Sequence, residues 1–477
     1  MLKRSRARVP TWAVLAVCCA AQFMVVLDIS IVNVALPKMR ADLGLSATGQ
    51  QWIINAYTLT FAGFLMFGGR AADLFGRRRT FVFGLSLFTV SSLLGGLAQN
   101  GGSLIAARAV QGVGGAILAP ATLSLITTTF IDPSARRRAL GAWSATAASG
   151  SAVGVLAGGI LTDLLDWRWV LFVNVPIGAA LVAAALVSLT ESRAEQRPSL
   201  DITGAVTVTG GLALLVYGIV STDTRRWGSA ATILTLAGAA ALLAVFVVVE
   251  SRTANPLVPL GIFRRRSVAA ANGIAVTIGA ALFGLFFFLS LYLQQMQNYS
   301  PLKTGVAFLP AALSTMVGAI VGTRIVTVLG ARRQLVIGPL MAAGGLAWLT
   351  QLSAGDGYFS SVFGPLLLCG IGLGLSFVPM TIAATSDMPM HQAGLASGLL
   401  NTARQVGGAV GLAAMATVAA GAASPTAGYD RAFWISATAL GVGAGLALLL
   451  PGRPKPELTV VADIELAAPE GSLVASG

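Results

Sequence analysis

Long apolar segments recur along the whole chain and constrain its fold more than any other feature of the sequence. A helix needs about 20 mostly apolar residues to cross the hydrocarbon core of a bilayer, and stretches of this length recur between residues 11 and 450. The segments are uninterrupted, whereas the strands of a membrane β-barrel would alternate apolar and polar residues. Hydrophobic residues make up 56% of the 477 residues and charged residues only 10%, unlike an ordinary soluble domain. The sequence therefore predicts an all-α integral membrane protein.

The apolar segments predict fourteen membrane-spanning helices. Their expected ranges are 11–36, 50–69, 80–98, 103–126, 139–162, 169–189, 201–220, 229–249, 268–293, 304–328, 334–353, 359–383, 394–420 and 431–450. If the N-terminus is cytoplasmic, most of the 31 Lys and Arg residues fall in cytoplasmic segments, as the positive-inside rule requires. We therefore expect both termini in the cytoplasm. Because the net charge of +13 follows from this bias, no nucleic-acid partner is expected.

The longest polar connections, 191–200 and 251–266, isolate spans seven and eight from the others. The expected domains are an N-terminal six-helix bundle (1–190), two additional helices with their linkers (191–266), a C-terminal six-helix bundle (267–451) and a flexible cytoplasmic tail (452–477). GGRAADLFGRRR after span two resembles GTRIVTVLGARR after span ten. Such internal repeats are typical of transporters.

Asp28 lies in the stretch VVLDISIVNVALP and is the only acidic residue expected well inside a span. A charge at the centre of a bilayer costs at least about 2.5 kcal/mol, so such an acid is a functional candidate. Desolvation favours its protonated form and a nearby cation favours its charged form, so Asp28 could switch between them. The alternative is a permanently hydrogen-bonded acid that only fixes helix packing.

Two arginines are also embedded in expected spans. Arg108 is the natural partner of Asp28, because both are expected in the outer half of the bundle, at depths of ~8 and ~13 Å. Its alternative is to extend to the outer interface while its stem stays in the apolar layer. For Arg404, in NTARQVGGAVG, helix packing or a conformational lock competes with substrate contact.

These segments resemble the fourteen-span drug:proton antiporter family of the major facilitator superfamily, over nearly the whole chain. LDISIVNVALP is similar to the motif of the first helix, and LIAARAVQGVGGA to the motif whose arginine takes part in proton transfer, here Arg108 with Gln111. GRAADLFGRRR resembles the superfamily's loop signature, with Leu74 where a basic residue is usual. The matching residues are Gly69, Asp73, Gly76, Arg77 and Arg78. The resemblance implies that this loop latches the two halves together at the cytoplasmic face.

Span five carries a glycine series similar to the exporter motif of the family, with Val155 in place of the motif's proline. The series consists of Gly141, Gly150, Gly154, Gly158 and Gly159. Glycines let helices approach closely, and their spacing allows a bend on which the two halves rock. Ordinary packing of small residues is the alternative.

The resemblance implies a proton-coupled exporter of lipophilic drugs or antibiotics that uses the proton gradient and no cofactor. A dedicated exporter of one endogenous metabolite is the alternative within the same class. The sequence has no GxxxxGK[ST] signature for ATP. A channel is less favoured, and so is a membrane-embedded enzyme, because neither clustered nucleophiles nor metal ligands accompany the single His.

Polar and aromatic residues within the spans are candidates for the substrate cavity, and helix packing is the alternative for each. They are Asn33, Asn55, Tyr57, Gln111, Phe286, Gln294, Asn401, Arg404 and Gln405. Because one embedded acid accompanies two embedded arginines, the expected substrate is lipophilic and neutral, monocationic or anionic. The expected partners are this substrate, protons and membrane lipids, with a monomer as the working unit and no metal.

Overall fold

The computed structural model of the protein describes residues 10–192, 201–223, 225, 228–253, 256–353, 355, 357–386, 388 and 393–451. The described residues form helices and connecting segments without a β-strand. The predicted flexible tail, 452–477, lies outside them. The helices are α1 Thr11–Asp42, α2 Ala47–Phe75, α3 Arg77–Gly96, α4 Gly101–Thr129, α5 Pro133–Leu164, α6 Trp169–Phe172, α7 Asn174–Ser188, α8 Ile202–Val220, α9 Ala230–Arg252, α10 Arg266–Leu291, α11 Pro301–Leu329, α12 Ala331–Leu349, α13 Gly364–Thr385, α14 Ala393–Ala420 and α15 Pro425–Ala447.

These helices confirm the fourteen predicted spans, with α6 and α7 together forming the sixth. Within the described part of the chain, eleven helical segments are long and apolar enough to cross a membrane. The remaining three predicted spans correspond to α12, α14 and α15. Short 3-10 turns follow α8 (η1, Ser221–Asp223) and precede α10 (η2, Leu260–Arg264), while π-helical turns extend α10 (η3, Tyr292–Met296) and begin the α13 span (η4, Phe359–Phe363).

Polar residues at the helix starts explain why several helices begin where they do. The Asn100 side chain accepts a hydrogen bond from the backbone N–H of Ser103 at 2.9 Å and begins α4. The Ser300 hydroxyl does the same for Lys303 at 3.2 Å and begins α11. Each cap satisfies a backbone donor that the first turn of a helix leaves free.

Two of the connections consist of a single glycine. Gly76 joins α2 to α3 and Gly330 joins α11 to α12. Both have positive φ, 105° and 78°, a region that residues with a side chain rarely adopt. They occupy matching positions in GGRAADLFGRRR and GTRIVTVLGARR. The weak sequence repeat therefore corresponds to the same backbone turn in each half.

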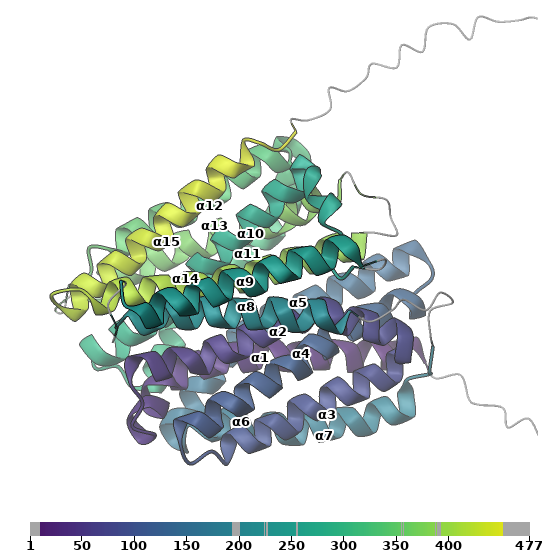
Figure 1. Cartoon of the computed structure of the whole chain (residues 1–477), viewed down its shortest axis with the longest axis horizontal. Helices are drawn as coiled ribbons and strands as arrows, with labels where there is room; N and C mark the ends of the chain where they lie inside the picture. Colours follow the sequence, from purple (N-terminus) through teal and green to yellow (C-terminus); the bar gives the residue numbers. More distant parts are fainter. Residues whose placement is uncertain are drawn as a thin grey trace, which may run out of the picture.

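The helices pack in two groups with a helix pair between them (Figure 1). In the first group α1 packs on α4 and α5, α2 on α4, and α3 on α4 and α7. In the second α10 packs on α14 and α15, α11 on α13, and α12 on α13 and α15. The groups meet where α5 contacts α11 and α2 contacts α14, while α8 packs on α9, α2 and α14. The exact domain boundaries, after residues 190 and 266, stay a prediction.

Candidate functional site

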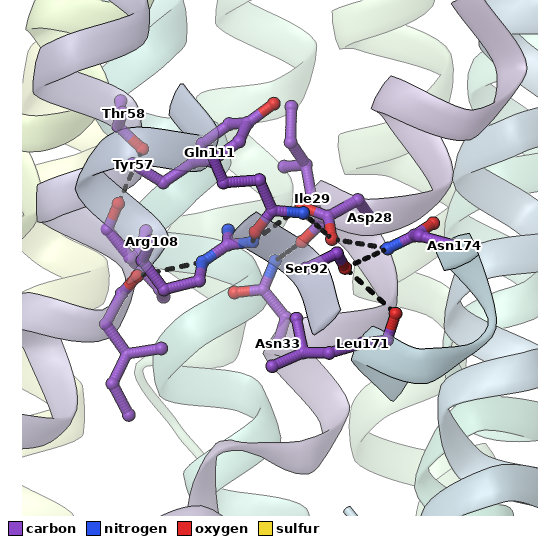
Figure 2. A network of polar contacts seen from close by, with 12 residues as sticks. Asp28, Ile29, Asn33, Tyr57, Thr58, Ser92, Arg108, Gln111, Leu171 and Asn174 are labelled. Atoms are coloured by element: carbon purple, nitrogen blue, oxygen red, sulfur yellow. Dashed lines mark hydrogen bonds and ion pairs between the residues drawn. The ribbon is translucent and has the colours of Figure 1, made fainter. Parts of the chain in front are cut away.

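Asp28 is fully buried in the middle of α1, and its carboxylate is the centre of a polar network (Figure 2). Oδ2 forms a salt bridge with Arg108 Nη1 at 2.6 Å. Oδ1 accepts two hydrogen bonds, from Gln111 Nε2 at 2.9 Å and from Asn174 Nδ2 at 2.9 Å. Four side chains from α1, α4 and α7 therefore meet around one intramembrane carboxylate.

Arg108 on α4 has partners besides Asp28. Nη1 donates to Gln111 Oε1 at 2.7 Å, and Nε donates to the Ile53 carbonyl of α2 at 3.3 Å. The guanidinium carbon also lies 4.3 Å from the centre of the Tyr57 ring, within the range of a cation–π interaction. The guanidinium thus has neutral partners in addition to Asp28. The arginine is 2% exposed, so it does not extend to the interface.

Asn174 is the member of this network that the sequence analysis missed. It begins α7, and its amide Nδ2 also donates to Ser92 Oγ at 3.1 Å. Ser92 in turn donates to the Leu171 carbonyl at 2.8 Å. One signal could have identified it: Asn174 lies as far from the start of its expected span (169–189) as Arg108 does from the start of 103–126. The same depth on two inward-running helices predicts proximity.

Buried polar groups without partners lie on α2, the helix that Arg108 contacts at Ile53 and Tyr57. Both amide atoms of Asn55 and the hydroxyl of Tyr57 have no hydrogen-bond partner among the described residues, although both side chains are buried. Buried polar groups in folded proteins are almost always hydrogen-bonded. Of the predicted cavity residues, Asn55 and Tyr57 therefore retain unused hydrogen-bonding capacity, whereas the amide of Gln111 is engaged by Asp28 and Arg108.

Two predicted cavity residues lie instead at a contact between the two helix groups. Gln294 Nε2 donates to the Val34 carbonyl of α1 at 3.0 Å and to Ser290 Oγ at 3.1 Å. Ser290 donates to the carbonyl of Asn33 at 3.3 Å, while the Asn33 side chain bonds to its own helix at Ile29. These bonds join α1 to the end of α10, at the side of the protein that the charge bias assigns to the outside.

The remaining cavity candidates lie on α10 and α14. The Phe286 ring packs on Phe308 with centroids 5.1 Å apart. Arg404 Nη2 donates to Asn401 Oδ1 at 2.8 Å, and its guanidinium lies 5.7 Å from the ring centre of Phe377. None of the ion pairs formed by the described residues includes Arg404. Gln405 is buried next to it. The structure does not join these residues to the Asp28 network by a direct bond.

The glycines of α5 allow close contact with α1. A Cβ on Gly154 would lie 2.8 Å from the Leu27 carbonyl oxygen, closer than such atoms approach. A Cβ on Gly150 or Gly158, one turn away on either side, would lie 3.0 Å from the Phe23 carbonyl oxygen or 2.7 Å from the Ile31 carbonyl oxygen of α1. Any larger residue at these positions would move α1, which carries Asp28, away from α5.

The other two glycines of the series differ from these three. Gly159 faces the second helix group, where a Cβ would lie 2.7 Å from the Pro301 carbonyl oxygen at the start of α11. Gly141 has no neighbour within 4 Å of such an atom. The series therefore contributes to the α1–α5 contact and to the α5–α11 contact, except at Gly141.

Of the residues expected to latch the two halves, Arg77 and Arg78 make their polar contacts with the first helix group and with the segment that follows α7. Arg77 pairs with Asp73 at 3.3 Å and donates to Ser124 Oγ at 2.6 Å and to Ser192 Oγ at 3.2 Å. The backbone N–H of Arg78 lies 3.3 Å from a carboxylate oxygen of Glu191. Gly69, on α2, packs on α4. In this conformation these bonds join α2, α3, α4 and the segment after α7, and they do not cross to the second group.

The sequence of the chain matches a family model and the sequences of known proteins. The family model described as Major Facilitator Superfamily matches residues 18–412. A cephamycin export protein of Amycolatopsis lactamdurans is 44% identical over 411 residues, which cover 85% of this chain and 84% of the relative. A puromycin resistance protein of Streptomyces alboniger is 42% identical over 424 residues, which cover 88% of this chain and 83% of the relative.

A similar fold occurs among solved structures. The crystal structure of the peptide transporter POT in complex with sulfate matches with a TM-score of 0.68, covering 92% of this chain and 96% of that chain. The two sequences are 16% identical, so this likeness concerns the fold alone.

Proposed function

The chain belongs to the Major Facilitator Superfamily, and we propose that it is a proton-coupled exporter of lipophilic small molecules such as drugs or antibiotics. The observation that carries the proposal is the fully buried ion pair between Asp28 and Arg108. A buried charge is retained only with partners, and intramembrane acids mark proton or substrate pathways. The names of the two relatives, an export protein and a resistance protein, support the direction of transport.

In the proposed cycle the transported proton binds to Asp28 Oδ2. The neutral carboxyl group then loses its ionic attraction for Arg108 Nη1, and the bond between α1 and α4 weakens. Gln111, the Ile53 carbonyl and the Tyr57 ring still hold the guanidinium, so the unpaired cation is not left without partners. Loss of the proton to the cytoplasm restores the ion pair. One proton thus moves inward for each such cycle while substrate moves outward.

Substrate would bind between the two helix groups, near the unused polar groups of α2 and the guanidinium of α14. The unbonded amide of Asn55 and hydroxyl of Tyr57 offer both donors and an acceptor, and Arg404 offers a positive charge. We place the protein in the bacterial cytoplasmic membrane as a monomer, with both termini in the cytoplasm. On this orientation the bonds from Gln294 and Ser290 to α1 join the two helix groups at the outer side.

The test is proton release from the purified, detergent-solubilised protein in weakly buffered solution when a candidate substrate is added. The wild type should release protons, and Asp28→Asn should not, because its amide neither gains nor loses a proton near neutral pH. Asp163→Asn removes an exposed acid at the end of α5 and serves as the matched control, with release like the wild type. Wild-type release and transport by Asp28→Asn would refute the proposal.

A dedicated exporter of one metabolite remains a second candidate, because the name of each relative refers to one compound. Cephamycin and puromycin differ, yet the two relatives are about equally similar to this chain. The degree of sequence identity therefore does not indicate which compound this chain exports. Expression in a drug-sensitive host separates the candidates: reduced accumulation of several unrelated compounds supports the multidrug exporter, and reduced accumulation of one supports the dedicated exporter.

A further inference from the structure

A second pair of buried acids lies far along the chain from Asp28. Asp201 immediately precedes α8 and is 6% exposed, and Glu250 lies in the last turns of α9 and is 3% exposed. With Asp28 they are the buried carboxylates of the described residues. Neither belongs to the network of Figure 2. They lie where the additional helix pair, α8 and α9, begins and ends.

One oxygen of each acid is hydrogen-bonded to backbone. Asp201 Oδ1 accepts from the N–H of Gly204 at 2.7 Å and begins α8, and Glu250 Oε2 accepts from the N–H of Val258 at 2.9 Å. These bonds fix both carboxyl groups in place. The first bond is local to the start of α8, and the second joins the end of α9 to the segment that follows it.

The other two oxygens have no donor among the described residues. Asp201 Oδ2 and Glu250 Oε1 are buried and unbonded. They lie 2.6 and 2.7 Å from one point, the position that a Cβ on Gly204 would occupy. Two acceptors therefore converge over a glycine that leaves them room. A proton on one of them would supply the hydrogen bond that both lack.

The net charge of Asp201, Glu250 and Arg70 also favours binding of a proton. Asp201 and Arg70 are the charged groups of the described residues whose fields act on Glu250, and Arg70 comes from α2. Arg70 also donates to the Pro256 carbonyl in the segment after α9. Two carboxylates and one guanidinium leave an excess negative charge, which burial penalises. One bound proton makes the cluster neutral.

The charged residues on the adjoining elements do not supply this neutralisation. Arg252, further along α9, and Arg264, on η2, are both exposed. On α14, which packs on α8, the charged residue is Arg404, and it bonds to Asn401. Among the described residues, the negative charge that Arg70 does not balance is therefore left for a proton to neutralise.

We propose that Asp201 and Glu250 share one bound proton and form a second proton site, separate from Asp28, where α8 and α9 meet α2. Binding adds H⁺ to the pair of carboxylates, and an O–H···O⁻ bond forms between Oδ2 and Oε1. Release returns H⁺ to solution and leaves two negative charges facing Arg70, which then holds the helix pair to α2 more strongly. Because Arg70 lies within the loop signature Gly69–Arg79, the site connects proton occupancy to the α2–α3 turn.

Infrared spectroscopy of the full chain in lipid nanodiscs tests this site, because a protonated carboxyl group absorbs apart from a carboxylate. The measurements use the Asp28→Asn background, so that Asp28 does not contribute. At neutral pH this variant should retain one carboxylic-acid band that shifts in D₂O. Adding Glu250→Gln should abolish the band, and adding Asp201→Asn should do the same. Adding Asp163→Asn, an exposed acid, should leave it unchanged.

Glu250→Gln is suited to this test because the structure of the pair survives it. The amide oxygen can accept the Val258 bond and the amide nitrogen can donate to Asp201, so the variant should unfold at the temperature of its parent. Absence of a carboxylic-acid band in the Asp28→Asn protein would overturn the proposal, and so would a band that survives both substitutions. Neither outcome bears on substrate-induced proton release through Asp28, so the two proposals fail separately.

Discussion

Asn174 and Gln111 donate to the same oxygen of Asp28, Oδ1, each at 2.9 Å. Asn174 is 146 residues from Asp28 along the chain. Arg108 occupies the other oxygen. Because all three bonds favour the charged carboxylate, the pair with Arg108 is not the whole of the site.

Replacement of Asn174 by Ala should change the pH dependence of proton release. The charged form of Asp28 loses a donor, whereas the protonated form loses less, so the proton stays bound to higher pH. A hydrogen bond to a charged group is worth about 1.5–3 kcal/mol, so its loss should move the midpoint of substrate-induced release to higher pH. Measurement of proton release against pH in the purified protein gives this midpoint.

Asn272→Ala provides the control for that variant. Asn272 is also a buried asparagine, but its amide donates to the Val268 carbonyl of its own helix. Its loss should leave the midpoint unchanged. Equal midpoints for Asn174→Ala and the wild type would show that Asn174 does not act on the proton of Asp28.

Arg108→Lys should impair transport although it keeps the charge. A lysine ammonium lacks the planar fork with which Arg108 reaches Asp28, Gln111 and the Ile53 carbonyl together. Loss of one charge-assisted bond of about 1.5–3 kcal/mol corresponds to a roughly tenfold or greater loss in the population of the paired state. Substrate uptake into inverted membrane vesicles measures the effect.

Arg136→Lys is the matched substitution at the start of α5, where Arg136 Nε donates to the Phe130 carbonyl at 3.0 Å. It should transport at nearly the wild-type rate. If Arg108→Lys transports as well as Arg136→Lys, the shape of the guanidinium is immaterial and only its charge matters.

Gly154→Ala should destabilise the protein, because the new methyl group meets the Leu27 carbonyl and the Cβ of Ser30 at 2.8 Å. Forcing one carbon into such a contact typically costs about 1–3 kcal/mol. Gly141→Ala belongs to the same glycine series but has open space, so the higher helix propensity of Ala should make it neutral or slightly stabilising. Thermal unfolding of the two variants in one detergent compares them, and equal losses would contradict the role assigned to the α1–α5 contact.

The sequence predicted the spans well because hydropathy measures what the bilayer requires. Each of the fourteen expected ranges overlaps a helix. Details that depend on backbone hydrogen bonds escaped it, such as the interruption at Val173 between α6 and α7 and the π-helical turn Tyr292–Met296. A π-turn changes the pairing of the backbone without changing its apolar character, so composition carries no sign of it.

The candidate site was predictable only where a charge was involved. Charged residues such as Asp28 and Arg108 are costly to insert into a membrane and therefore stand out in the sequence, and their expected place in the same outer half of the bundle suggested that they meet. Asn174 is neutral, so its insertion cost is smaller and it did not stand out from the surrounding VLFVNVPIG segment. The bond from Gln294 to the Val34 carbonyl depends on how two helix groups dock, which no local pattern encodes.

Arg404→Gln should distinguish substrates by their charge. Arg404 lies on α14 beside Asn401 and the Phe377 ring, and none of the ion pairs of the described residues includes it. An acidic group on the substrate would supply the missing partner. For a substrate with a carboxylate, loss of a charge-assisted bond of about 1.5–3 kcal/mol should raise the half-saturating concentration roughly tenfold or more.

The comparison between substrates decides what Arg404 does. For a neutral substrate the half-saturating concentration should change little, since no ion pair is lost, and Arg404→Lys should retain most of the binding of the anionic substrate. Uptake into inverted vesicles with one anionic and one neutral substrate of similar size measures both. If Arg404 serves instead to pack helices or to lock a conformation, Arg404→Gln should slow both substrates equally. A loss confined to the anionic substrate is the result that only direct contact with its charge explains.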